Sequence, residues 1–114
     1  MSRWNVTNSN TSSGAASATQ AAAGSNLTNV LDSISFSTNG GANVQVVVRD
    51  GASGVGTILW AKFAVGNQTI FGLSGLGIEG STNTAMTVEF VSGPGGSNLI
   101  SEVSATGHIG GGGC

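Results

Sequence analysis

Short apolar segments recur about every ten residues, between glycines and other turn residues, and this spacing constrains the fold more than any other feature of the sequence. It is typical of a β-sandwich or a barrel, in which each segment is one strand. No segment carries the 3.6-residue apolar stripe that a docked helix needs. We therefore expect an all-β domain of seven or eight strands. The clearest expected strands lie at 27–37, 43–49, 57–65, 68–73, 82–91 and 99–109.

Alternation within these segments predicts how the strands pair. In 27–37 the apolar side chains of Val30 and Ile34 share one face and serines occupy the other. The segment 43–49 alternates in the same way, so we expect these two segments to form a hairpin. The segment 57–65 is apolar on both faces, which predicts a central strand.

The last two segments carry weaker signals. In 82–91 we expect Met86 and Phe90 to face inward and Glu89 outward. The segment 99–109 keeps no single alternation, which predicts a bulge or a kink in that strand.

The two ends of the chain differ in composition from its middle. Residues 1–18 are mostly Ser, Thr, Asn, Gly and Ala, so we expect an N-terminal arm that is flexible or becomes ordered on a partner, with Trp4 as an anchor. Residues 19–109 are expected to form the β-sandwich domain. Residues 110–114 are four glycines and Cys114, which resemble an engineered conjugation handle.

Charged side chains are rare, with three basic and five acidic residues and a formal net charge of -2. The basic residues Arg3, Arg49 and Lys62 are too few and too scattered to neutralise a phosphate backbone, so we expect no nucleic-acid partner. A polar surface with so little electrostatic repulsion favours self-association. No segment approaches the ~18 apolar residues of a membrane span, so we also expect no membrane partner.

Catalytic chemistry has few candidates here. The single histidine, His108, is flanked by Gly107 and Ile109, and no serine lies in a Gly-x-Ser-x-Gly motif. One histidine and one cysteine cannot complete a zinc site, so we expect neither a metal nor another cofactor. We expect no enzyme; a hydrolase would need Asp50, Glu79 or Glu89 to meet His108 in the fold.

Five short motifs follow one another along the middle of the chain: Ser33–Ser37, Val46–Gly51, the strand around Trp60, Leu73–Gly75 and Met86–Phe90. In this order they resemble the small jelly-roll structural proteins of tailed bacteriophages, particularly the capsid cement or decoration proteins. The resemblance covers about three-quarters of the chain. It implies an antiparallel, jelly-roll-like β-sandwich of about eight strands with an extended N-terminal arm.

The same resemblance implies a function and partners. The chain would assemble with itself, as a homotrimer or another symmetric oligomer, and bind the major capsid protein on the surface of the virion, which it would stabilise. The contacts with these partners are predicted at Trp4, Val6, Trp60 and Lys62.

An alternative is open at this stage. Glycine-rich β-sandwiches also serve as carbohydrate- or receptor-binding modules of phage tails and adhesins. The loops at 75–82 and 93–97 would then form the binding site.

Overall fold

The computed structural model describes residues 3–10, 15–38, 44–64, 71–91 and 100–111, and none of these residues is helical. They form eight strands, which confirms the predicted all-β class. The strands are β1 (Arg3–Asn10), β2 (Ser17–Gln20), β3 (Leu27–Thr38), β4 (Val44–Asp50), β5 (Thr57–Ala64), β6 (Phe71–Glu79), β7 (Met86–Phe90) and β8 (Ser101–Gly111).

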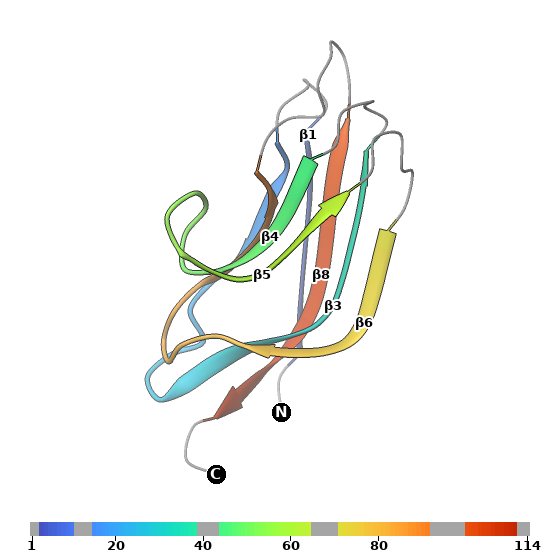
Figure 1. Ribbon diagram of the computed structural model, residues 1–114. Coiled ribbons are helices and arrows are strands. Elements are labelled where there is room, and N and C mark those ends of the chain that lie inside the picture. Colours follow the sequence, from blue (N-terminus) through green and yellow to red (C-terminus); the bar gives the residue numbers. More distant parts are fainter. Residues whose placement is uncertain (1–2, 11–14, 39–43, 65–70, 92–99, 112–114) are drawn as a thin grey trace.

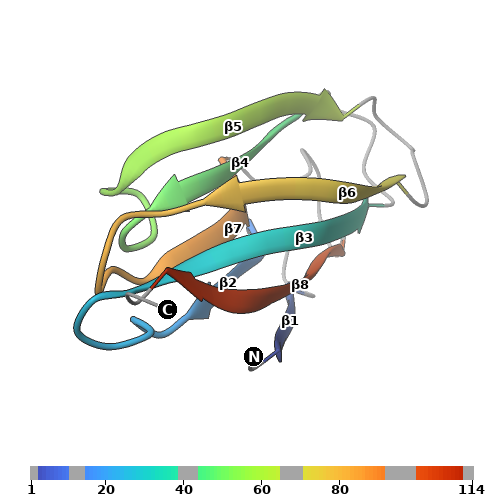
Figure 2. The same ribbon diagram turned by 90° about the horizontal axis from the view of Figure 1, so that it is seen from below.

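The strands form two antiparallel four-stranded sheets that face each other (Figure 1). Sheet A has the order β1-β8-β3-β6, and sheet B has the order β2-β7-β4-β5. This arrangement is a jelly roll, as predicted. Figure 2 shows β6, β3 and β8 side by side in one layer and β5, β4 and β7 in the other.

The predicted hairpin between 27–37 and 43–49 is wrong. β3 pairs with β6 and β8, whereas β4 pairs with β5 and β7, so the two segments belong to different sheets. In this topology only β4 and β5 are consecutive strands of one sheet. Every other pair of consecutive strands lies in opposite sheets, and such an arrangement leaves no local mark on the alternation of a single strand.

The prediction that 57–65 is a central strand is also wrong. β5 is an edge strand of sheet B, and its Ile58 and Leu59 are 47% and 37% exposed. The ladder between β4 and β5 shifts between Val48 and Arg49, so Leu59 is an extra residue on β5. In the part of the chain that the structure describes, no further strand pairs with this edge, so the apolar side chains of β5 do not indicate a central strand.

The core lies between the sheets and is built from both. Phe36 of β3 and Phe90 of β7 meet across it, with ring centroids 6.0 Å apart and an interplanar angle of 85°. Met86 and Phe90 face inward as predicted. Glu89 lies on the opposite face of β7 but is only 4% exposed, because other groups cover it. The buried core comprises Trp4, Ala16, Ala18, Leu31, Ile34, Phe36, Val46, Val48, Met86, Val88, Phe90, Val103 and Ala105.

Asp32 marks a bulge in β3. Both ladders of β3 shift register between Leu31 and Ser33, so Asp32 has no partner in either ladder. Because of this shift Leu31 packs in the core cluster with Ile34, whereas Val30 is buried outside that cluster. The irregularity predicted in 99–109 thus lies in the neighbouring strand.

The N-terminal segment predicted as an arm is strand β1 over Arg3–Asn10, at the edge of sheet A. All eight of its residues pair with β8, and β2 begins within the predicted arm at Ser17. Backbone hydrogen bonds to β8 order a segment that has few apolar side chains. At the other end β8 continues to Gly111, and Cys114 lies outside the described residues.

Candidate functional site

The outer face of sheet A carries mostly small hydroxyl side chains. Alternation in β3 directs Ser33 and Ser35 outward, since Ile34 between them is buried. On β8 the same alternation directs Ser104 and Thr106 outward. The ladders bring these positions together in rows, Ser33 with Thr106 and Ser35 with Ser104.

The rows extend onto both neighbouring strands. On β6, Ser74 lies opposite Ser33 and Gly72 lies opposite Ser35. On β1, Thr7 lies opposite Ser104, and their hydroxyl oxygens are 3.0 Å apart. We call the set Ser33, Ser35, Ser74, Ser104 and Thr106 the hydroxyl face.

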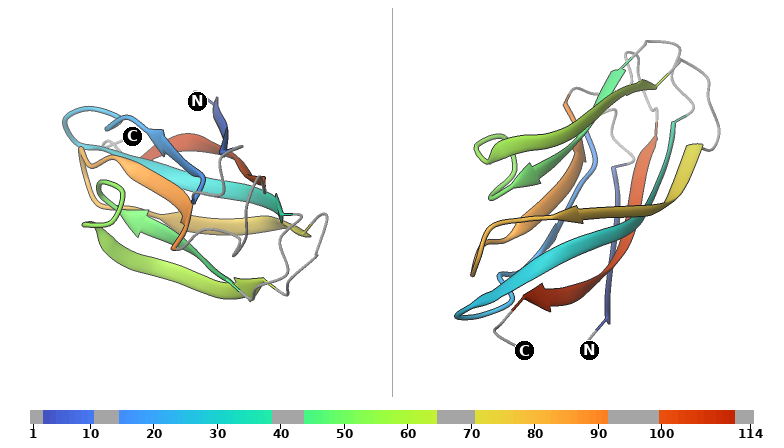
Figure 3. Two further views of the ribbon diagram at one scale, coloured as in Figure 1. Left: turned by 90° about the horizontal axis from the view of Figure 1, so that it is seen from above. Right: turned by 60° about the horizontal axis from the view of Figure 1, so that its bottom comes forward.

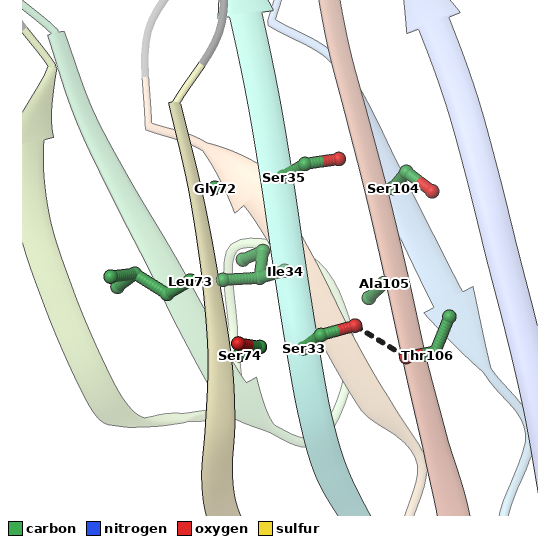
Figure 4. Close-up of a pocket in the computed structure, with 9 residues that line it drawn as sticks. All are labelled: Ser33, Ile34, Ser35, Gly72, Leu73, Ser74, Ser104, Ala105 and Thr106. Carbon is green, nitrogen blue, oxygen red and sulfur yellow. Dashed lines mark hydrogen bonds between the residues drawn. The ribbon is translucent and has the colours of Figure 1, made fainter.

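A hollow of about 360 Å³ lies on this face. Figure 4 shows Ser33, Ser35, Ser104 and Thr106 around it and the hydrogen bond between Ser33 and Thr106. Leu73 points away from these serines and packs against the core. At Gly72 a Cβ atom would meet only ordinary contacts, the nearest at 3.7 Å, so a small side chain would fit at this position.

Two further hollows adjoin the first one. A hollow of about 140 Å³ shares Ser35 and Ser104 with it and also touches Glu102. A hollow of about 390 Å³ shares Thr106 with it and is also lined by Arg3 and Trp4. We call the three together the sheet A groove.

Charged groups lie at both ends of the sheet A groove. At one end the Asp32 carboxylate contacts His108 Nδ1 at 2.8 Å and Arg3 at 3.7 Å. At the other end lies the exposed carboxylate of Glu102. The serines and threonine between these ends carry no charge.

The loop between β4 and β5 covers part of the outer face of sheet B. Residues 51–56 fold back over β7, where Ser53 Oγ and the Gly54 N–H donate hydrogen bonds to the Glu89 carboxylate. Arg49 forms an ion pair with the same carboxylate and donates a hydrogen bond to the Gly56 carbonyl at 3.0 Å. Figure 3 shows this compact loop between β4 and β5.

The electrostatic balance at Glu89 follows from these contacts. Burial alone would raise the pKa of the Glu89 carboxyl. Hydrogen bonds from Ser53, Gly54 and Arg49, together with the Arg49 charge, outweigh burial and lower the pKa below its ordinary value. The pair is therefore a structural clamp for the loop.

The four predicted partner contacts fall in different places. Trp4 is 9% exposed, lies in the core of its own chain and donates a hydrogen bond from Nε1 to the His108 carbonyl at 3.2 Å. Val6 is half-buried against the same core. Trp60 and Lys62 lie on the same side of β5, opposite Val48 and Val46. Contact of these residues with another chain stays a prediction.

The residues named for a hydrolase do not form one cluster. Asp50 accepts hydrogen bonds from Ser81, Glu89 pairs with Arg49, and His108 pairs with Asp32. Among the described residues no group of three or more His, Cys, Asp or Glu side chains could hold a metal ion. Likewise, no helix in the described part of the chain is long and apolar enough to cross a membrane.

The two loops predicted for ligand binding do not form a described loop site. Residues 75–79 belong to β6, where Gly75 and Gly77 take positive φ angles of 69° and 64° at a bulge opposite Asp32. Residues 93–97 lie outside the described residues. The alternation of serines in 33–37 was the available signal for the hydroxyl face.

The chain matches no protein-family model, and no curated protein sequence matches it. Solved structures with a similar fold include the CBM36-1 domain of a multidomain xylanase from the hindgut metagenome of Trinervitermes trinervoides, which is 14% identical with a TM-score of 0.50. That match covers 98% of this chain and 99% of that chain. The Drosophila NLP core is 16% identical with a TM-score of 0.52, over 96% and 98% of the two chains. PirA is 10% identical with a TM-score of 0.50, over 92% and 94%. At these identities the likeness shows a shared β-sandwich fold.

Proposed function

We propose that this protein is a carbohydrate-binding module that holds a saccharide on the hydroxyl face of sheet A. The observation that carries the proposal is the hollow of about 360 Å³, whose lining includes the five side chains of the hydroxyl face and Gly72. Its size is within the range of small-molecule sites in proteins. The fold is compatible with this role, since the CBM36-1 domain of a xylanase shares it.

Hydroxyl side chains suit a saccharide ligand chemically. Each Ser or Thr hydroxyl can donate one hydrogen bond and accept two, as a sugar hydroxyl can. Ser33 and Ser104 can exchange their present hydroxyl partners, Thr106 and Thr7, for ligand hydroxyls with little change in backbone position. Several weak contacts of this kind, made at once on a rigid sheet, give useful affinity.

The substitution Gly72→Val tests the site directly. The position has room for a Cβ atom, and valine favours strands, so the variant should fold with stability equal to or higher than the original, by up to about 1 kcal/mol. Its side chain would occupy the hollow and abolish binding. Retention on immobilised xylan, cellulose, mannan and β-glucan, followed by calorimetry with the retained polysaccharide, measures the loss.

Ala61→Val is the matched control. Ala61 is exposed on β5, in the other sheet, so the variant adds the same kind of bulk away from the groove. It should bind as the original protein does. The proposal fails if no saccharide is retained, or if Gly72→Val binds as well as Ala61→Val.

A second proposal is decoration of a viral capsid by an oligomer of this chain. The observation in its favour is the exposed apolar edge at Ile58 and Leu59, which self-association would cover. Under this proposal Trp60 and Lys62, on the same strand, also contact the partner chain. Native mass measurement tests the self-association that it requires.

A further inference from the structure

We infer that the ligand is a linear, uncharged oligosaccharide of about three units that lies along β8, one unit in each hollow of the sheet A groove. This inference rests on the proposed function and adds the length, direction and charge of the ligand. It follows from how the hollows join and from where the charged side chains lie.

Each of the two outer hollows adjoins the central one. The central hollow shares Ser35 and Ser104 with the hollow at Glu102, and it shares Thr106 with the hollow at Arg3. Residues 102–107 of β8 therefore run beside the whole path. At about 3.3 Å per residue this stretch is about 17 Å long, which suits an extended chain better than a single sugar ring.

The charges select against an acidic chain. Glu102 lies at one end of the path, and Asp32 lies near the other. Glu79 also belongs to that second end, because Glu79 and His108 both lie opposite Val30. Arg3 is the cation that lines the groove, and it already contacts Asp32. A chain of carboxylates or sulfates would meet more negative than positive charge, whereas a neutral chain meets no such cost.

A length series tests the inference. Calorimetry would compare xylo-, cello- and manno-oligosaccharides of one to six units with oligogalacturonates of the same lengths, all at low salt. We expect the affinity for the preferred neutral series to rise at least about tenfold from one unit to three and then to level off. Oligogalacturonates should bind at least about tenfold more weakly than neutral chains of equal length.

Ser37→Phe locates the path. Ser37 lines only the end hollow beside Glu102, so a phenyl ring there should fill that hollow and leave the central one open. The variant should lose the gain from the third unit and keep the affinity for two. Ala61→Val should keep the full length dependence.

The outcomes separate this inference from the proposed function. If single sugars bind as tightly as trimers and Gly72→Val abolishes that binding, the inference is wrong while the proposed function stands. If oligogalacturonates bind more tightly than neutral chains of equal length, the inferred charge of the ligand is wrong while the proposed function stands. If no saccharide binds, both are wrong.

Discussion

At the scale of single residues, Gly107 is a position that only glycine can fill. A Cβ atom there would lie 2.2 Å from Trp4 Cζ2 and 2.2 Å from the Val30 carbonyl oxygen of the neighbouring strand. Gly107→Ala should therefore lower the free energy of unfolding by about 1–3 kcal/mol, since the clash involves backbone that cannot move alone. Chemical denaturation measures this. Gly72→Ala, where contacts begin at 3.7 Å, should not lower stability.

Glu89 gives the molecule a predictable response to acid. Its folded pKa lies below the ordinary value of 4.5, so the ionised carboxylate stabilises the fold above that pH. This stabilisation is lost as the pH falls through the folded pKa, because protonation then removes the charge that Arg49 and the loop require. The unfolding midpoint should therefore drop as the pH falls below about 4.5.

Glu89→Gln should lose that part of the pH dependence. It should also cost about 3 kcal/mol at pH 7, because the 14% exposed Arg49 side chain would remain without its partner charge. Glu102→Gln, at an exposed position, should keep the pH dependence of the original protein. An identical pH profile for Glu89→Gln and the original protein would contradict the role of the clamp.

At the scale of elements, β1 depends on its pairing with β8 and on Trp4. Removal of residues 1–10 should lower the unfolding temperature, since loss of the Trp4 side chain alone costs about 3–5 kcal/mol. It should also leave β8 as an unpaired edge and so promote association that depends on protein concentration. Thermal unfolding and sedimentation velocity measure the two effects. A truncated protein as stable as the full chain would show that β1 contributes little to stability. As a control, Asn5→Ser should leave the unfolding temperature and the association unchanged.

Strand positions could be predicted from the sequence because turn residues and alternation are local. The strands that pair with β3 and β5 could not be predicted in this way. The bulge at Asp32 reverses the alternation of β3, and no glycine or proline in this strand indicates its position. The apolar residues of β5 indicate burial equally well in a central strand or in an edge that another molecule covers. Trp4 illustrates the same limit, since its burial depends on Gly107, more than a hundred residues away.

At the scale of the whole molecule, the candidate site exists only because of the jelly-roll topology. The serines of β3 suggest a polar face, but their rows with β6 and β8 join segments about 40 and 70 residues apart. Nothing local in the sequence places Gly72 beside Ser35. The low charge of the groove could be predicted from the sequence, because a chain with three basic and five acidic residues has too few charged side chains to line a long groove.

The free edge at β5 leads to a prediction about assembly. Lys62 and the bulge at Leu59 both interrupt this edge, and such features limit indiscriminate pairing of edge strands. We therefore expect any self-association through β5 to have a fixed stoichiometry and to use Ile58.

Native mass spectrometry should then give a multiple of the 11.1 kDa mass of one chain. Ile58→Thr should return the mass to that of one chain without loss of stability, because Ile58 is 47% exposed. Lys62→Val should instead broaden the distribution toward larger species. A single-chain mass for the original protein at all concentrations would remove β5 as an interface and, with it, the capsid proposal.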